Sequence, residues 1–195
     1  MKNKIVFLLS LFLICAVCRF TGAVWADEGE KEKKPFFLSP TAGWYFPSSG
    51  KVKDAFGSSW GGFGVSINPE AFGWKRKEEN TEGVRLSPYI GYFHADEGGN
   101  EAHIVPLGLE ARWTLKEWDG ARAYMGVGLA GYGIKFEDRR AGIDTSWRGA
   151  GGGRIMIGAD ISKWLTLDAS YNAVSDVEGY NFGGFAVGAQ VNLYF

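Results

Sequence analysis

Cysteine and histidine are both scarce in this chain of 195 residues, which contains two of each. Cys15 and Cys18 lie in an apolar stretch near the N-terminus, and no cysteine follows them. Beyond that stretch the fold must therefore be held by packing and hydrogen bonding rather than by disulfides. The sequence also lacks a glycine-rich phosphate loop followed by a helix. We predict no catalytic residue, no metal site and no cofactor.

Long uncharged apolar runs are missing after residue 26, so a membrane-spanning helix is not expected there. Before that point Lys2 and Lys4 precede an apolar run, and Val24-Trp25-Ala26 offers small residues at a cleavage position. We therefore expect three segments: a cleaved signal peptide at 1–26, a disordered charged tether at 27–35, and one folded domain at 36–195.

An excess of either charge is also lacking, since the formal net charge of the chain is −1. The first 26 residues contain Lys2, Lys4 and Arg19 and no acidic residue, which leaves −4 for the remainder. A mildly acidic domain is a poor partner for phosphate backbones, so we predict that the protein does not bind nucleic acid.

The sequence is rich in glycine and aromatic residues, with 29 Gly and 15% aromatics, and it shows strict alternation. From 182 to 195 (FGGFAVGAQVNLYF) large apolar side chains occupy every second position, with Gly, Ala and amide side chains between them. This period of two is typical of a β-strand with one apolar face. The opposite face is too small to need a second sheet. A narrow barrel with the apolar face outward fits both features, because glycine relieves crowding on the inner wall.

The same alternation predicts an all-β fold, an antiparallel up-and-down barrel of eight strands. Each strand is near the length that a tilted membrane-crossing strand needs. The expected strands are 36–46, 59–68, 84–94, 103–114, 121–135, 147–161, 164–174 and 182–195.

Tryptophans gather at the predicted strand ends, which favours two aromatic girdles at the two membrane interfaces. If the first strand runs outward from the periplasm, Trp44, Trp60 and Trp147 form the outer girdle. The periplasmic girdle then consists of Trp74, Trp113, Trp118, Trp164 and Phe195.

Charged residues on the small-residue faces are predicted to point into the lumen, where unpaired charges are costly. We expect them to form a plug of salt bridges, in which Arg154 pairs with Glu110 or Asp168. The alternative interpretation of the same charges is an ion gate or proton path. The predicted lumen charges are Arg85, Glu110, Arg112, Arg154, Asp160 and Asp168.

Three stretches, GVGLAGYGIKF from Gly126, GGRIMIGADISKWLTLDASYNAV, and the terminal VNLYF, resemble small eight-stranded outer-membrane barrels. These are outer-membrane protein X, the transmembrane domain of outer-membrane protein A, and opacity-type proteins. The resemblance implies a transmembrane β-barrel in the bacterial outer membrane, exported by a cleaved signal peptide and surrounded by membrane lipid and lipopolysaccharide. It also implies a monomer whose C-terminal strand is read by the barrel assembly machinery.

The expected function is non-enzymatic, either structural or in surface interaction through the outer loops. In the loop 137–146, Arg139 and Arg140 could meet lipopolysaccharide phosphates. One alternative is a lipid-A-modifying acyl hydrolase or transferase that uses His94 or His103. The same histidines with neighbouring acids are a weaker candidate for a metal site. A further alternative is a conduit for small hydrophobic molecules, whose apolar upper lumen would hold Tyr45, Phe93, Ile104 and Tyr132.

Overall fold

The computed structural model describes residues 38–68, 84–118 and 120–193. The expected signal peptide and tether, the segment 69–83, and the predicted girdle residues Trp74 and Phe195 lie outside the described residues.

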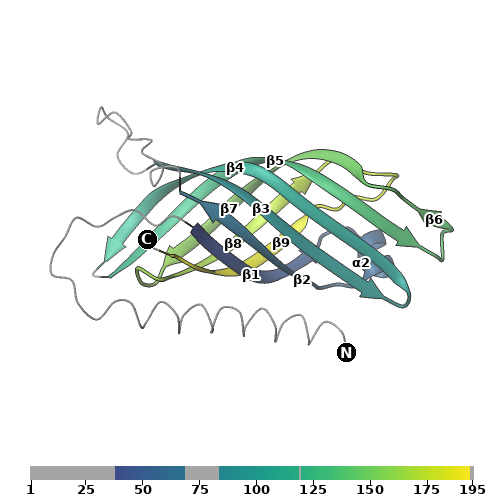
Figure 1. Ribbon diagram of the computed structural model, residues 1–195, viewed down its shortest axis with the longest axis horizontal. Coiled ribbons are helices and arrows are strands. Elements are labelled where there is room, and N and C mark those ends of the chain that lie inside the picture. Colours follow the sequence, from purple (N-terminus) through teal and green to yellow (C-terminus); the bar gives the residue numbers. More distant parts are fainter. Residues whose placement is uncertain (1–37, 69–83, 119, 194–195) are drawn as a thin grey trace.

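Eight long strands form a closed antiparallel barrel (Figure 1). Each strand pairs with the next long strand in the sequence, and β9 pairs with β1 to close the cylinder. The prediction of an eight-stranded up-and-down barrel is therefore confirmed. The long strands are β1 (Leu38–Pro47), β2 (Trp60–Ile67), β3 (Val84–Glu97), β4 (Asn100–Trp118), β5 (Ala121–Asp138), β7 (Arg148–Asp160), β8 (Leu165–Val174) and β9 (Gly184–Val191).

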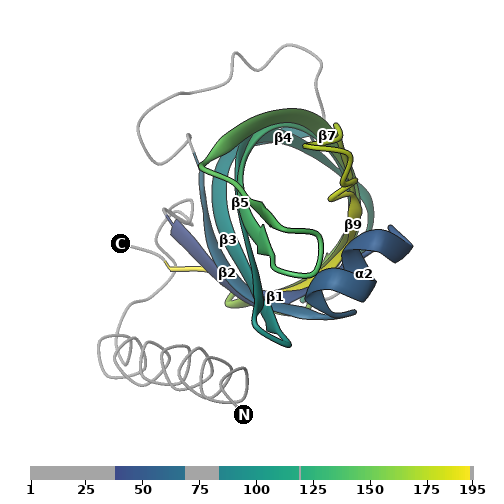
Figure 2. The same cartoon turned by 90° about the vertical axis from the view of Figure 1, so that its right-hand side faces the viewer.

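The two ends of the barrel differ, and we call them the loop end and the turn end. The loop end carries the helix α2 (Gly50–Phe56), the short strand β6 (Ile143–Asp144) and residues 175–183 (Figures 1 and 2). The turn end carries the start of β1, the turn at 161–164 and the end of β9 (Figure 1). Strands β4 and β5 contain 19 and 18 residues, more than the sequence predicted and more than a bilayer crossing requires. Their pairing runs without a break from 101/137 to 114/124, and a bulge follows near the turn end.

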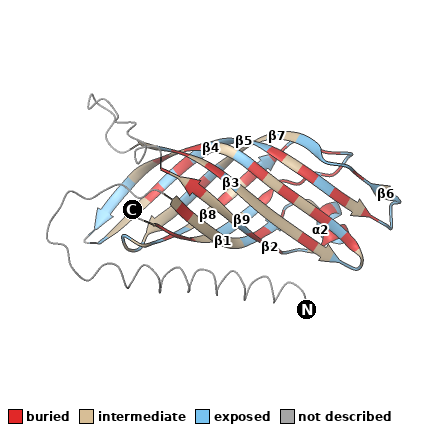
Figure 3. Cartoon of the chain, viewed as in Figure 1, coloured by how far each residue is buried: buried red, intermediate tan, exposed pale blue. Residues whose placement is uncertain are grey.

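The outward face of the barrel is apolar along the middle of the strands, as the alternation predicts. The side chains of Leu107, Leu129 and Ile157 are 61%, 77% and 60% exposed, and those of Val127 and Val187 are exposed as well. Buried and exposed positions alternate along the strands (Figure 3). A soluble barrel with its larger apolar side chains inside would show the reverse pattern.

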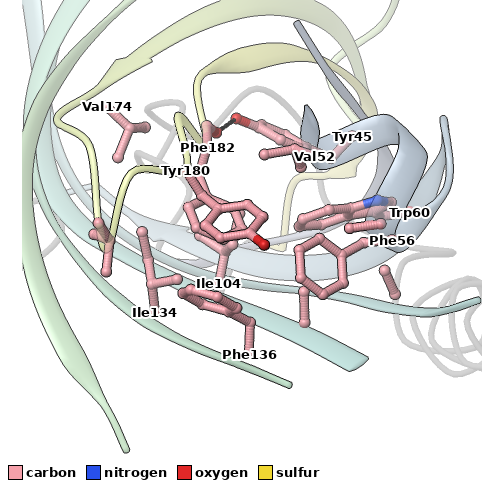
Figure 4. Close-up of a cluster of buried hydrophobic side chains, with 14 of the residues drawn as sticks. Tyr45, Val52, Phe56, Trp60, Ile104, Ile134, Phe136, Val174, Tyr180 and Phe182 are labelled. Atoms are coloured by element: carbon pink, nitrogen blue, oxygen red, sulfur yellow. Dashed lines mark hydrogen bonds between the residues drawn. The ribbon is translucent and has the colours of Figure 1, made fainter. Parts of the chain in front are cut away.

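Inside the loop end, an apolar cluster fills the barrel (Figure 4). Helix α2 contributes Val52, Ala55 and Phe56, and the segment 175–183 contributes Val177, Tyr180 and Phe182. The strands supply the rest of the cluster: Tyr45, Trp60, Ala95, Ala102, Ile104, Tyr132, Ile134, Phe136 and Val174.

This cluster shows that the segments 47–58 and 175–181, which fall between predicted strands, are not simple polar loops. Val52, Ala55 and Phe56 have the i, i+3, i+4 spacing that places side chains on one face of a helix. That face covers the mouth of the barrel, so apolar side chains that would otherwise meet water are buried.

Within the described residues no helix is both long and apolar enough to cross a membrane.

Trp60 belongs to this cluster, so its assignment to the outer girdle is wrong. Its side chain is 0% exposed and meets Phe56 edge-on, with ring centroids 6.3 Å apart. Its indole N–H donates a hydrogen bond to the Gly57 carbonyl at 3.0 Å. Along β2, Trp60 shares the inward face with Gly62 and Gly64, whereas Phe63 is exposed.

The other described girdle candidates lie near strand ends. Trp44 and Trp147 are 41% and 54% exposed toward the loop end, and Trp118 is 51% exposed at the turn end. Trp113 and Trp164 are partly exposed, also toward the turn end.

Candidate functional site

Glu110 is the centre of a buried polar network in the lumen, on the turn-end side of the apolar cluster. Its carboxylate is paired with the guanidinium of Arg112 on the same strand. On its other side, Nη1 of Arg154 on β7 lies 3.4 Å from Oε2 of Glu110. Arg154 also donates a hydrogen bond from Nη2 to the Ser170 hydroxyl at 3.1 Å. Arg154 thus contacts Glu110, one of the two partners that the sequence suggested for it.

Asp168 joins this network through an amide side chain. Gln190 donates a hydrogen bond from its amide nitrogen to the Asp168 carboxylate. The other end of the same amide lies 3.5 Å from Nη1 of Arg112, which also donates to the Tyr124 hydroxyl at 3.3 Å. The four residues Glu110, Arg112, Arg154 and Asp168 are therefore linked across β4, β7, β8 and β9.

Asp160 forms a separate group nearer the turn end. Arg122 donates two hydrogen bonds to one of its carboxylate oxygens, at 3.0 and 2.7 Å. The Thr166 hydroxyl donates to the other oxygen at 2.7 Å. The remaining predicted lumen charge, Arg85, lies opposite Arg112 in the β3–β4 register.

The sequence prediction missed Arg122, Tyr124 and Gln190 as members of these groups. A signal was present, because all three are even-numbered residues on strands whose even positions face inward. Arg122 is partly exposed near a strand end, where alternation is a weaker guide than in the middle of a strand.

A cavity of about 80 Å³ borders the central network. Such a volume holds a few water molecules, and it does not make a diffusion pore. Arg112, Arg154 and Tyr89 line it, and each has a buried polar atom with no hydrogen-bond partner among the described residues. Water is the natural hydrogen-bond partner for these atoms, because each is a donor that would otherwise be buried without an acceptor.

The barrel wall beside this cavity contains a local interruption. Strands β3 and β4 pair at Ile90/Leu107 and again at Phe93/Ile104, but the two positions between them are unpaired. Pro106 lies in this gap and has no N–H to donate to the sheet. A Cβ on Gly91, directly opposite, would approach the Pro106 ring at 3.2 Å.

Hydrogen bonds hold the loop-end closure in place. The Tyr180 hydroxyl donates to the Asp138 carboxylate at 2.7 Å, and the Asn100 side chain donates to the Ala55 carbonyl of α2 at 2.8 Å. Burial, together with the hydrogen bond to Asp138, raises the pKa of Tyr180 to about 12. Burial alone would raise the pKa of Asp138, but the hydrogen bonds from Tyr180 and two backbone N–H groups outweigh it and hold that pKa below its ordinary value.

The two histidines lie side by side on the outward face, toward the loop end. His94 on β3 is directly opposite His103 on β4, and the imidazole rings stack with centroids 4.8 Å apart. Nδ1 of His103 shares a hydrogen bond with the Tyr92 hydroxyl at 2.8 Å, and Nε2 lies 3.9 Å from the Glu101 carboxylate. Among the described residues, no group of three or more His, Cys, Asp or Glu side chains is arranged to hold a metal ion.

Comparison with known proteins identifies the fold of the chain but not its function. No protein-family model matches the sequence, and no curated protein matches it. Among solved structures, the chain is similar to neisserial surface protein A, with a TM-score of 0.56 and 14% identity over 84% of this chain and 100% of that one. It is also similar to the outer-membrane enzyme PagL, with a TM-score of 0.54 and 13% identity over 80% of this chain and 99% of that one.

The chain therefore has the fold of the small eight-stranded outer-membrane barrels, as its sequence resemblance implied. An enzyme and a surface protein share this fold, so the fold does not select between the two kinds of function.

Proposed function

We propose that the protein is an integral β-barrel of the bacterial outer membrane, with a structural or surface-interaction role and no enzymatic activity. The observation that carries this proposal is the apolar outward face, which includes Leu107, Leu129 and Ile157. Moving each such side chain from water into hydrocarbon gains roughly 1–3 kcal/mol. A closed sheet is also one of the few structures that satisfies its backbone hydrogen bonds in lipid.

The closed lumen supports a role other than general diffusion. On one side of the cavity, Glu110 and two arginines fill the interior, and on the other side the apolar cluster closes the loop end. In the proposed orientation the turn end faces the periplasm and the loop end faces outward. The loop end then presents an ordered outer surface built on α2 and the β5–β6 hairpin, which suits interaction with another molecule.

The proposed partners follow from this placement. Membrane lipid and lipopolysaccharide would surround the barrel, and the barrel assembly machinery would read its C-terminal strand during insertion. We further propose that the barrel works as a monomer, without nucleic acid.

Gel migration of the detergent-extracted protein tests the proposal. An unheated sample should migrate as a compact folded species, and a boiled sample should migrate at the mass of the unfolded chain. Protease added to intact cells should cut at the loop end and leave the turn end protected. Unchanged migration on heating, or release of the protein with the soluble periplasmic fraction, would refute the membrane assignment.

A second candidate function is a conduit for small, mostly apolar molecules, and the interruption at Gly91 and Pro106 favours it. The gap lies in the wall of a cavity whose lining also includes Phe93 and Arg154. The apolar residues that this alternative places in the upper lumen belong to the apolar cluster or pack against it, and the Tyr45 hydroxyl donates a hydrogen bond to the Phe182 carbonyl of the closure. Uptake of a small apolar dye into protein-containing liposomes separates the candidates, because the proposed closed barrel predicts no uptake above empty liposomes.

The hydrogen bond between Tyr92 and His103 is the observation that favours the enzymatic alternative. The hydroxyl that contacts this imidazole is a phenol, and phenols are weaker candidates for acyl transfer than the serine of a hydrolase triad. Replacing both histidines with glutamine and recording lipid A by mass spectrometry tests this alternative. A changed acyl pattern would establish an enzyme and overturn the proposed function.

A further inference from the structure

Three nitrogen-bearing side chains form a row across the outward face of three neighbouring strands. His94 on β3 is opposite His103 on β4, and His103 is in turn opposite Lys135 on β5. Directly opposite residues on one face of an antiparallel sheet have Cβ atoms about 4.5–5.5 Å apart. The three side chains are therefore neighbours, although 41 positions separate the first from the last in the sequence. We call them the nitrogen row.

The nitrogen row lies at the boundary between the apolar belt and the charged tips of the strands. On the side of the belt, Tyr92 packs against Phe63 with ring centroids 5.4 Å apart, and Trp147 lies 6.3 Å from the His103 ring. On the side of the tips, the next outward positions are Asp96 and Glu101, which are opposite each other. Aromatic rings mark the headgroup zone of a bilayer, so the row is at the height where lipid phosphates lie.

The imidazoles have hydrogen-bonding capacity that the protein leaves unused. His103 is bonded through Nδ1 to Tyr92, and the 3.9 Å from its Nε2 to Glu101 is too long for a hydrogen bond. Nδ1 of His94 is buried and makes no hydrogen bond with any described residue, so a headgroup would meet this ring through Nε2. Protonated imidazole is a donor at both nitrogens, and an anion beside two stacked rings favours protonation of both because it offsets the repulsion between their charges.

From this arrangement we infer that His94, His103 and Lys135 bind the phosphate of an outer-leaflet lipid headgroup, and that they bind it more tightly as the pH falls. This inference rests on the proposed outer-membrane placement, because it needs the loop end to face the outer leaflet. Phosphate is the anion present at that height, and the row offers it one permanent cation and two that form on acidification.

The groups around the imidazoles determine the direction of the pH effect. Tyr92 and Asp96 come from β3, Glu101 from β4 and Lys135 from β5, while β2 places Gly61 opposite His94. Near neutral pH the two carboxylates of Asp96 and Glu101 outweigh the charge of Lys135, so the site has a net negative charge and repels phosphate. Protonation of the imidazoles gives the row an excess of positive charge. Bound phosphate in turn stabilises the protonated imidazoles, so lipid binding and proton uptake reinforce each other.

Histidine NMR provides a direct test, because the chain has two histidines and both are in the row. Protein with labelled imidazole carbons is placed in nanodiscs of phosphatidylcholine, with or without phosphatidic acid. Phosphatidic acid should raise the titration midpoints of both imidazoles, and the protein should hold it several-fold more tightly near pH 5.5 than near pH 7.5. Lys135→Gln should weaken this preference, whereas Lys53→Gln, which removes a cation from the exposed face of α2, should leave it unchanged.

Two outcomes would overturn the inference. Midpoints that are identical with and without phosphatidic acid would show that the row binds no lipid phosphate. An equal rise caused by inorganic phosphate at the same concentration would show that free phosphate, not a lipid, is the ligand. Heat-modifiable migration of the same samples keeps this test separate from the proposed function. If the protein migrates as a folded barrel but its histidines do not respond to phosphatidic acid, the phosphate-binding inference is refuted and the proposed function is not.

Discussion

Replacing Glu110 with glutamine is the sharpest test of how the lumen is held together. The carboxylate is fully buried between two guanidinium groups, and the substitution removes its charge with little change in volume. At the 3.4 Å that separates it from Arg154, the attraction between unit charges is roughly 5 kcal/mol before desolvation is subtracted, for an effective dielectric constant near 20. Breaking a buried pair from one side costs about 3–5 kcal/mol, since the other charge stays buried.

We expect the low end of that range for Glu110→Gln. Asp168, held by Gln190, remains as a second carboxylate in the network and compensates part of the positive charge. The measurement is the free energy of unfolding by urea in lipid vesicles, followed by tryptophan fluorescence. The matched control is Glu137→Gln, which breaks an exposed pair with Arg139 and should leave the free energy of unfolding almost unchanged.

A double variant makes the reasoning refutable. Adding Arg154→Met to Glu110→Gln removes one of the uncompensated cations, so the double variant should be more stable than Glu110→Gln by at least about 1 kcal/mol. The reasoning is refuted if the free energy of unfolding of Glu110→Gln lies within about 1 kcal/mol of that of the parent protein. It is also refuted if the double variant is less stable than Glu110→Gln, since the Glu110 carboxylate would then not compensate the buried arginines as described.

Further predictions concern the loop end and the outward face. Tyr180→Phe should cost about 1.5–3 kcal/mol, because it leaves the buried Asp138 carboxylate without its hydroxyl donor; the same urea titration measures this. Since the pKa of Asp138 is lowered by folding, its stabilising effect should persist above about pH 4 and disappear as the pH falls through the folded-state pKa. Protection of the amides in 175–183 against exchange, corrected for the intrinsic rate at each pH, should therefore fall in acid. Trp60→Ala should cost about 3–5 kcal/mol and Trp147→Ala much less, because only the first ring is in the apolar cluster; equal losses would contradict this placement. Leu129→Arg should lower the free energy of unfolding in vesicles by about 2–4 kcal/mol, and no loss would argue that this face does not meet lipid.

Alternation in the sequence was enough to predict the number of strands, their pairing order and the direction of their faces. Each strand has two faces, and the large apolar residues on one of them identify it as the outer surface. The contact between Arg154 and Glu110 could also be anticipated, because both positions lie on inner faces and buried charges require partners.

The apolar cluster could not be predicted in the same way. Alternation tells which face a residue occupies, but not which distant segment fills the space in front of it. Phe56 and Phe182 are 126 positions apart and meet at a centroid distance of 6.2 Å. The place of Trp60 at a strand end predicts that it lies at the membrane interface, whereas the alternation of β2 places it on the inward face. Position along the strand and side of the strand gave different answers, and the side of the strand was the better guide.

The closure of the loop end also determines where this barrel can accept new sequence. Insertions into α2 or 175–183 would separate Phe56 from Tyr180 and Phe182, so they should disrupt folding. The tip of the β5–β6 hairpin differs, because Gly142 has φ of +66° and a Cβ there would meet no atom within 4 Å. A foreign epitope inserted at Gly142 would extend into open space and leave the hydrogen bond from Arg140 to the Asp54 carbonyl of α2 in place, whereas the same epitope placed beside α2 would compete with the packing that seals the barrel.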